Sequence, residues 1–206
     1  MNKLLIKTFA VAAILGTAAL TTQGRVKDTA HKLHGTNGVS VAHEEVCRPC
    51  HTPHNASTEV GYLWNHQLST ATWTLFEDAD AASVMNSSSR LCLSCHDGTV
   101  AIDSYGGATG TVFLTGRENL GTDLTRSHPI GVTYPTTGTR YNLADATGNV
   151  VDSVETPAGQ SAHIEDGKVQ CSSCHFAHGS RAAYGMFLRV DNTGSKLCMT
   201  CHKSPG

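Results

Sequence analysis

Residues 46–55 read "VCRPCHTPHN", and this stretch decides what kind of fold the chain can adopt. Two residues separate Cys47 from Cys50, and His51 follows the second cysteine directly. A zinc site, a disulfide and a redox dithiol all use paired cysteines, but none of them requires a histidine at that position. The pattern therefore needs a chemistry that uses two thiols and one imidazole together.

The same five-residue pattern occurs four times, and every cysteine of the chain belongs to one copy. Cys-x-x-Cys-His is the attachment signature of c-type haem. The two thiols add across the vinyl groups of the porphyrin, and the histidine binds the iron on its proximal face. We therefore expect four covalently bound haem c groups. The attachment residues are Cys47, Cys50, Cys92, Cys95, Cys171, Cys174, Cys198 and Cys201, and the proximal iron ligands are His51, His96, His175 and His202.

Eight histidines lie outside the motifs, twice as many as four haems need for a sixth ligand. Methionine is the competing ligand, but apart from the first residue and the motifs only Met85 and Met186 remain. We therefore expect bis-histidine ligation at all four haems. The predicted distal ligands are His31, His54, His128 and His178, with His34 as a weaker candidate. We interpret His43, His66 and His163 as exposed, or as lying beside a haem without binding iron.

Two of the predicted distal ligands follow a motif closely. His54 comes three residues after His51, and His178 comes three residues after His175. On a helix, residues three apart project from one face, so neither can reach the far side of its own haem. We expect each to bind the iron of a neighbouring haem. Motifs with the extra histidine alternate with motifs that lack it, which suggests a duplicated two-haem unit.

The composition predicts little side-chain core. Aromatic residues make up 6% of the 206 residues, and strongly apolar periodic segments are scarce. Such a chain cannot easily bury a large core of side chains, so the haems must pack against one another in its middle. We expect a mostly irregular, loop-rich fold wrapped around a core of four packed c-type haems. It should contain short α-helices at the motifs, as at 87–98 and 195–203, and a small β-hairpin within 106–121. Trp64, Trp73 and Phe76 are expected to pack on haem edges.

Residues 1–24 are predicted to be a secretory signal peptide. Lys3 and Lys7 precede an apolar run at 9–20, which is too short to span a bilayer. Residues 25–206 are then expected to form a single tetrahaem domain that is exported through the periplasm, secreted, and free of a membrane anchor. Without Lys3 and Lys7, 13 basic residues remain against 17 acidic ones, a net charge of −4, which argues against nucleic acid as a partner.

Several segments together resemble the doubled-CxxCH, cytochrome c3-like family of multihaem cytochromes. Within that family, a secreted tetrahaem chain of this size is similar to the OmcE-type cytochromes of metal-reducing bacteria, which polymerise into extracellular haem filaments. The resemblance implies bis-histidine haems, a loop-dominated fold and ligand sharing between subunits. His34 departs from the pattern, since relatives commonly carry serine there. The segments are "HKL" (31–33), the first motif, "YLWN" (62–65), "LCLSCHDGTVAIDS" (91–104), "SHPIG" (127–131), "VQCSSCHFAHG" (169–179) and "LCMTCHK" (197–203).

The leading hypothesis is therefore a passive electron carrier, not an enzyme. We expect it to join head to tail into a conductive filament, with His31 or His34 as a ligand shared across the joint. Its redox partners would lie at the cell surface or be extracellular acceptors. The alternatives are a soluble periplasmic or surface shuttle, a multihaem reductase, and a membrane-anchored quinol dehydrogenase. A reductase needs an open iron position, whereas all four motifs are complete and histidines are in surplus.

Overall fold

The computed structural model describes residues 26–33, 45–179 and 185–203, and within these ranges the chain is mostly loop. The loop-rich fold with short helices is confirmed. The predicted signal peptide lies outside the described residues, as do His34 and His43. The elements are η1 (Val26–Asp28), α1 (Ala81–Met85), α2 (Ser88–His96), η2 (Gly116–Glu118), β1 (Asn149–Val150), β2 (Ala162–His163), α3 (Cys171–Cys174), η3 (Thr193–Ser195) and α4 (Lys196–Cys201).

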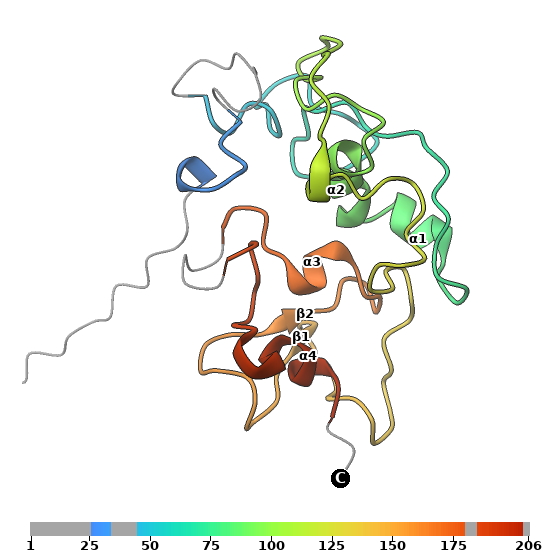
Figure 1. Ribbon diagram of the computed structural model, residues 1–206, viewed down its shortest axis with the longest axis vertical. Helices are drawn as coiled ribbons and strands as arrows, with labels where there is room; N and C mark the ends of the chain where they lie inside the picture. Colours follow the sequence, from blue (N-terminus) through green and yellow to red (C-terminus); the bar gives the residue numbers. More distant parts are fainter. Residues whose placement is uncertain (1–25, 34–44, 180–184, 204–206) are drawn as a thin grey trace, which may run out of the picture.

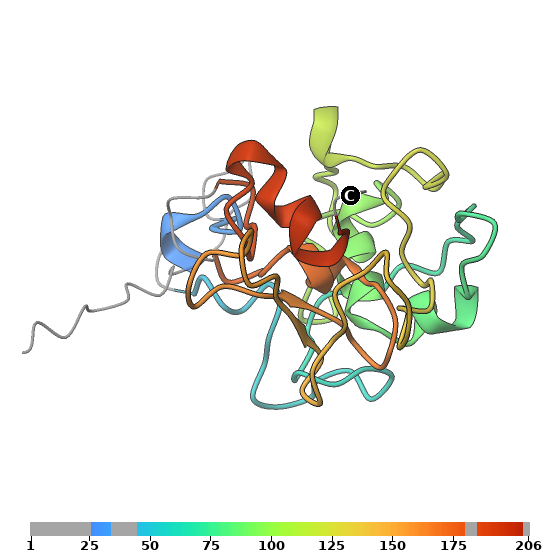
Figure 2. The same cartoon turned by 90° about the horizontal axis from the view of Figure 1, so that it is seen from below.

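These short elements fall into two halves. Helices α1 and α2 contact each other in one half, and β1, β2 and α4 lie together in the other (Figure 1). Helix α3 lies between the halves, in contact with both α2 and β2. The view from below shows long loops connecting and surrounding these elements (Figure 2). Two halves are thus joined across α2 and α3, which carry the second and third motifs.

Helix α2 is the longest of the described helices and has defined ends. The side chain of Ser87 accepts a hydrogen bond from the backbone N–H of Ser89, which caps the first turn. Gly98, just beyond the C-cap residue Asp97, has φ of +75°, a conformation that glycine adopts at little cost. The second motif therefore occupies the last turns of a helix. The helical turns expected at 87–98 and 195–203 are present as α2 and α4.

The described part of the chain has one small sheet, and it lies elsewhere than predicted. Strands β1 and β2 pair antiparallel, with Val150 opposite Ala162. The prediction of a hairpin within 106–121 was wrong, because a side chain organises that segment. The Asp103 carboxylate accepts hydrogen bonds from the backbone N–H groups of Thr111 and Val112. These bonds use donors that a strand ladder would need, and the segment is a loop with η2 inside it.

Buried apolar side chains form small, separate clusters instead of one core. One contains Trp73, Val84, Leu93 and Leu124, a second contains Tyr134, Val150, Ala162 and Ile164, and a third surrounds Ile102. Trp73 packs in the first cluster and donates its indole N–H to Asp97 Oδ2 at 3.0 Å, and its contact with a haem edge stays a prediction. Among the residues that the structure describes, no helix is long and apolar enough to cross a bilayer.

Candidate haem sites

Each motif closes one turn of helix. The backbone N–H of the motif histidine donates to the carbonyl of the first cysteine, at 2.9 Å for His51, 3.1 Å for His175 and 2.8 Å for His202. In the second motif the same turn is the end of α2. One turn of helix places the two cysteine side chains on neighbouring positions of one face, with the histidine next to them. This is the local geometry that two thioether bonds and one axial ligand require.

In three motifs a short bridge holds the histidine against a distant segment. His51 pairs with Trp64, His175 with Leu188, and His202 with Tyr141, each antiparallel. At each bridge the residue after the histidine donates its N–H to the distant segment, and a residue of that segment donates to the carbonyl of the second cysteine. All six bonds are between 2.8 and 2.9 Å long. In the first motif they join Thr52 to Leu63 and Asn65 to Cys50; in the third, Phe176 to Phe187 and Arg189 to Cys174; in the fourth, Lys203 to Arg140 and Asn142 to Cys201.

The proximal imidazoles are oriented through their Nδ1 atoms. A backbone carbonyl accepts the Nδ1–H of His51, His96 and His175; the carbonyls belong to Tyr62, Glu118 and Met186, at 2.7, 2.8 and 2.8 Å. A carbonyl can only accept, so Nδ1 must carry the proton and Nε2 keeps its lone pair. Fixing the tautomer in this way leaves Nε2 as the nitrogen that can bind a metal.

The first and third motifs obtain this carbonyl from the same unusual turn. Tyr62 and Leu63 have φ of +67° and +53°, and Met186 and Phe187 have φ of +43° and +59°. Two consecutive non-glycine residues in the left-handed region cost free energy, about 1–2 kcal/mol per residue. The turn directs the carbonyls of Tyr62 and Met186 at the two imidazoles, so the cost is matched by a structural role in both places.

Three of the four motif histidines face a second histidine from elsewhere in the chain. The ring centres are 6.0 Å apart for His51 and His178, 6.2 Å for His96 and His31, and 6.3 Å for His202 and His128. A first-row metal lies about 2 Å from a coordinating imidazole nitrogen, so an iron held between two imidazoles separates their ring centres by roughly 6 Å. The observed spacings fit an iron atom between each pair.

Two of these distal histidines are also fixed through Nδ1. His31 donates to the carbonyl of Ala177 at 2.8 Å, and His128 to the carbonyl of Pro129 at 3.1 Å. The ring of His31 also stacks on Phe187 with centres 4.4 Å apart. Burial lowers the pKa of His31, which favours the neutral imidazole that binds a metal. His31 and His178 are neighbours, because the carbonyl that orients His31 belongs to the residue before His178.

The remaining motif histidine, His175 of the third motif, has no second imidazole in ring contact among the described residues. His54, the predicted distal ligand in the equivalent position to His178, is exposed. The reasoning that placed His51 and His54 on one face of a helix was wrong, because residues 52–55 form no helix. The same holds after the third motif, where α3 ends at Cys174 and His175 is extended, with φ of −110° and ψ of 146°. His175 pairs with Leu188 in an antiparallel bridge, and this extended pairing replaces a further turn of helix.

The remaining described histidines do not face a motif histidine. His66 is buried, 4% exposed, and its two ring nitrogens lie 2.8 Å from the carbonyl of Gln67 and 3.1 Å from that of Ala101. A carbonyl only accepts, and burial lowers the pKa of His66, so the neutral ring donates to one of these two carbonyls. His66 Nε2 also lies 3.5 Å from the sulfur of Cys95, which places His66 beside the second motif. His163 lies half-buried on β2.

The second and third motifs meet across the boundary between the halves. The thiols of Cys92 and Cys171 are neighbours, and their interaction raises the pKa of Cys92 and lowers that of Cys171. Around them, Ser89 Oγ donates to Gln170 Oε1 at 2.6 Å and accepts from the N–H of Cys171 at 3.0 Å. The Glu165 carboxylate accepts from the Ser88 N–H and from the hydroxyls of Ser88 and Ser172. A polar network thus fixes the second attachment site relative to the third.

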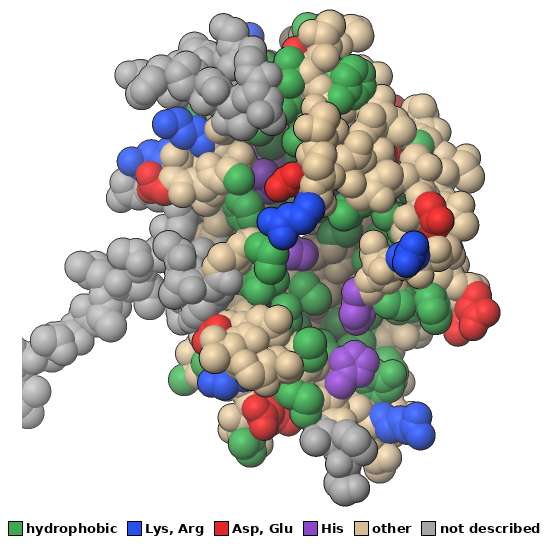
Figure 3. Space-filling model, in the orientation of Figure 1, with side chains coloured by type: hydrophobic (Ala, Val, Ile, Leu, Met, Phe, Trp, Pro, Cys, Tyr) green, Lys and Arg blue, Asp and Glu red, His purple; other side chains and the backbone are tan. Residues whose placement is uncertain are grey.

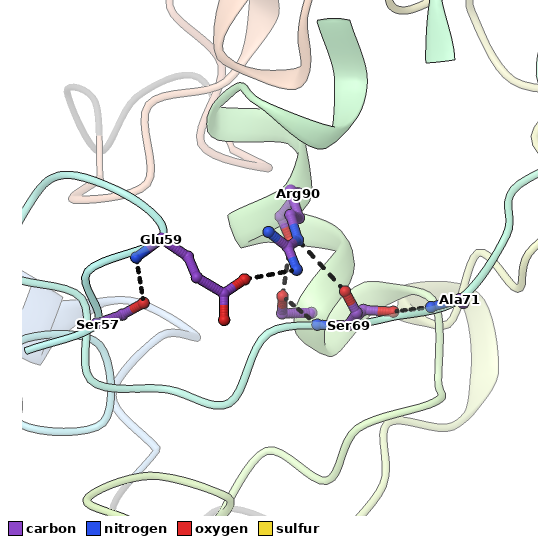
Figure 4. A network of polar contacts seen from close by, with 6 residues as sticks. Ser57, Glu59, Ser69, Ala71 and Arg90 are labelled. Carbon is purple, nitrogen blue, oxygen red and sulfur yellow. Dashed lines mark hydrogen bonds and ion pairs between the residues drawn. The ribbon is translucent and has the colours of Figure 1, made fainter. Parts of the chain in front are cut away.

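A second network ties α2 to the loop that follows the first motif (Figure 4). Arg90 on α2 forms an ion pair with Glu59 at 3.2 Å, and its Nε donates to the carbonyl of Ser69 at 3.3 Å. The N–H of Ser69 donates to Ser94 Oγ at 2.9 Å, and Ser94 Oγ donates to the carbonyl of Arg90 at 2.7 Å. The loop between the first two motifs is therefore held against the helix that carries the second.

The cysteines and histidines fit covalent haem better than redox or disulfide chemistry. All eight cysteines are free thiols in the structure. Burial raises the pKa of Cys50 and of Cys174 to about 11, whereas a reactive dithiol needs a lowered pKa. The pKa of Cys171 is lowered, but by Cys92 of another motif and not by the second cysteine of its own. Histidine side chains gather along the middle of one face, where the surface is hollowed and hydrophobic side chains line it (Figure 3). Trp64 Nε1 is buried with no hydrogen-bond partner in the described protein, as expected if a bound group supplies the acceptor.

The comparison with known families points the same way. A family model described as "Doubled CXXCH motif" matches residues 163–206, which contain the third and fourth motifs. The match indicates a multihaem c-type cytochrome. Covalent c-type haem and electron transfer are the cofactor and activity that this motif implies. Among curated proteins, none matches the chain.

Sequence reasoning missed the backbone groups that orient the imidazoles. The carbonyls of Tyr62, Met186 and Ala177 carry no side-chain signature, so residue types alone do not reveal them. One signal was present: an offset of 124 residues that aligns Cys47 with Cys171 also aligns Gly61 with Gly185. Extending the comparison beyond the motif and its extra histidine would have identified the two turns as equivalent.

Proposed function

We propose that the chain is a tetrahaem c-type cytochrome that carries electrons and performs no catalysis of its own. The supporting observation is the set of three imidazole pairs, each joining a motif histidine to a histidine from a distant segment at 6.0 to 6.3 Å. The remaining motif histidine, His175 of the third motif, has the same kind of bridge and the same kind of Nδ1 bond as His51. Four complete attachment motifs support four haems.

The haem irons supply one-electron redox chemistry when bound. At three motifs the protein would hold the iron between two imidazoles, and it would keep the attachment sites close together. An iron held in this way would have no open position for a substrate, which favours an electron carrier over a reductase. The contact between Cys92 and Cys171 keeps the second and third sites close, as electron transfer between them requires.

Mass spectrometry of the denatured protein tests the cofactor count, since thioether-bound haem stays on the chain. We expect four haems per chain. Electron paramagnetic resonance of the oxidised assembled protein should then show low-spin iron throughout, and the reduced protein should not bind carbon monoxide. A high-spin site that binds carbon monoxide in the assembled protein would support the reductase instead.

We further propose that secreted copies join head to tail into an extracellular filament. His175 lacks an imidazole partner among the described residues, while His54, the counterpart of His178, is exposed and 124 residues before it. Within the described residues, His175 has no second imidazole and His54 faces no motif histidine. A second copy would supply a partner for each, and a contact of this kind does not close on itself. A soluble shuttle is the competing function.

Of the two shared ligands expected from sequence, His34 lies outside the described residues and His31 already has a partner. His31 faces His96 within the same chain at 6.2 Å, so it is not free to enter a neighbour. We propose His54 as the ligand that crosses the joint. Its carbonyl accepts a hydrogen bond from the hydroxyl of Thr52 at 2.8 Å, which fixes the backbone of an otherwise exposed segment.

Electron microscopy of wild type, His54→Ala, His34→Ala and His43→Ala tests the filament and its ligand. We expect wild type, H34A and H43A to form filaments with low-spin haems only, and H54A to remain monomeric with one haem in four high-spin. Filaments of H54A with four low-spin haems would exclude His54 as the ligand. Monomeric wild type with four low-spin haems would support the shuttle.

A further inference from the structure

The residue directly opposite each bridged histidine differs from motif to motif. Trp64 lies opposite His51, Leu188 opposite His175, and Tyr141 opposite His202. Residues directly opposite each other in an antiparallel pair project from the same face of the ladder. Each of these side chains therefore lies on the same face of the ladder as its histidine. The three motifs share the backbone arrangement, but the side chain opposite the histidine is an indole in the first motif, an alkyl chain in the third and a phenol in the fourth.

Trp64 is buried in a way that leaves its polar atom unsatisfied. It is 8% exposed, and its Nε1–H has no hydrogen-bond partner in the described protein. A buried donor without an acceptor costs about 1–3 kcal/mol. The chain's other tryptophan, Trp73, is equally buried and donates to the Asp97 carboxylate at 3.0 Å. An unpaired indole N–H at Trp64 therefore calls for an acceptor outside the described part of the polypeptide.

The surroundings of Trp64 place this acceptor at the first motif. The indole meets the His51 ring edge to face, with centres 6.1 Å apart and planes at 86°. Its other aromatic neighbour is His66, at 6.3 Å, whose ring nitrogens lie 2.8 and 3.1 Å from the carbonyls of Gln67 and Ala101. Asn65, the next residue, donates its N–H to the carbonyl of Cys50. Trp64 is thus fixed to the motif by backbone bonds on both sides.

We propose that the Trp64 indole N–H donates a hydrogen bond to a propionate carboxylate of the haem bound by Cys47 and Cys50. This inference rests on the proposed function, since it needs haem at the first motif. A bound haem offers two kinds of polar atom: pyrrole nitrogens, which are occupied by the iron, and propionate oxygens, which accept hydrogen bonds. The carboxylate is therefore the acceptor that the ligand itself brings. Trp64 acts as a positioning residue, because it touches the haem periphery and not the iron.

The bond makes two otherwise equivalent haems different. An ionised propionate stabilises ferric iron, and a donor that shares its charge weakens this effect, so the donor favours the ferrous state. The equivalent position in the second repeat is Leu188, which has no donor. The haem at the first motif is therefore easier to reduce, on this account, than the one in the same backbone frame at the third motif.

Spectroelectrochemistry of Trp64→Phe in the full-length holoprotein tests the effect on reduction. Phenylalanine keeps the aromatic packing and removes the N–H. We expect one of the four haems to become about three- to tenfold harder to reduce, tenfold being about 59 mV for a one-electron couple. The propionate bending region of the resonance Raman spectrum should change as well. Leu188→Met, which adds no donor at the equivalent position, should leave all potentials unchanged.

Nuclear magnetic resonance of reduced wild type and Trp73→Phe, labelled with nitrogen-15 tryptophan, detects the bond directly. Low-spin ferrous haems are diamagnetic, and W73F assigns the remaining indole signal to Trp64. We expect a downfield indole proton that exchanges slowly with solvent. Unchanged potentials in W64F, or a rapidly exchanging indole proton in wild type, would overturn the bond while four low-spin haems still supported the carrier. Fewer than four haems would count against the carrier itself. If W64F fails to fold, the wild-type resonance decides.

Discussion

Residues 47–65 and 171–189 are built alike and yet use their second histidine differently. The two segments are related by a constant offset of 124 residues, and both show the helical turn, the bridge, the left-handed turn and the carbonyl that holds the proximal imidazole. Even a side-chain bond recurs, since Asn65 donates to the carbonyl of Arg48 and Arg189 to that of Ser172. His178 nevertheless faces His51, while His54 is exposed.

The difference shows that the local frame and the long-range ligand are separate properties. The frame is set by bonds within about 20 residues and therefore repeats with the sequence. The destination of the second histidine depends on what packs beside it. In the second repeat, Ala177 and Phe187 contact His31, and this places His178 against the first motif. The repeats have equivalent backbone frames, and their second histidines have different surroundings.

The largest expected effect comes from removing each second histidine. His178→Ala should leave the haem at the first motif without its sixth ligand, so one quarter of the low-spin signal becomes high-spin. His54→Ala should cause the same fractional loss at the third motif. Only H54A should abolish filaments, because His178 acts within its own chain. Electron paramagnetic resonance combined with electron microscopy separates the two variants. Equal effects on assembly would refute the assigned difference.

A smaller effect, on the free energy of unfolding, is expected at the position where the two repeats make the same side-chain hydrogen bond with different residues. Arg189 donates to the Ser172 carbonyl and also lies 5.3 Å from the centre of the Phe176 ring. Asn65 makes the backbone bond, at 2.7 Å, with its amide. Arg189→Leu should lower the free energy of unfolding by about 2 kcal/mol and Asn65→Leu by about 1 kcal/mol. Denaturant unfolding of both variants measures this. A larger loss for N65L would reverse the ranking.

Glu165 tests the junction of the two halves. Burial opposes its ionisation, but the hydrogen bonds from Ser88 and Ser172 outweigh burial and hold the pKa of Glu165 below its ordinary 4.5. Its stabilisation is therefore complete above about pH 5 and is lost as pH falls through the lower folded-state pKa. Glu165→Gln should cost about 1.5 kcal/mol at pH 7. Thermal unfolding from pH 7 to pH 3 should show wild type and variant converging at the acid end; a constant gap would contradict this origin.

The smallest effect distinguishes two equivalent glycines. Gly185 has φ of +61°, whereas Gly61 lies outside the left-handed region, and neither has an atom within 4 Å of an added Cβ. Gly185→Ala should therefore cost about 1 kcal/mol through backbone strain alone. Gly61→Ala should stay within about 0.5 kcal/mol of wild type. Parallel melting curves give both values, and similar losses would show that the two turns begin in the same conformation.

Sequence reasoning reached the attachment chemistry because thiol and imidazole spacing is local. The pattern formed by Cys47, Cys50 and His51 can be recognised within five residues. The helical turns at the second and fourth motifs were predicted from the same spacing. Ligand partners were harder to predict. His178 lies far from His51 along the chain, and only the packing of Ala177 against His31 brings the two together. The sheet was misplaced for a related reason, since the Asp103 carboxylate takes the N–H groups that a hairpin would have used.

The pairing of His178 with His51 also bears on the order in which the protein is made. A chain is synthesised from its N-terminus, so the first motif is complete long before residue 178 exists. A haem attached there early has no access to its final axial partner, and His54 is the nearest histidine that follows on the chain. If His178 binds the iron at the first motif, as proposed, the first half would reach its final coordination only after nearly the whole polypeptide has been made and has folded back.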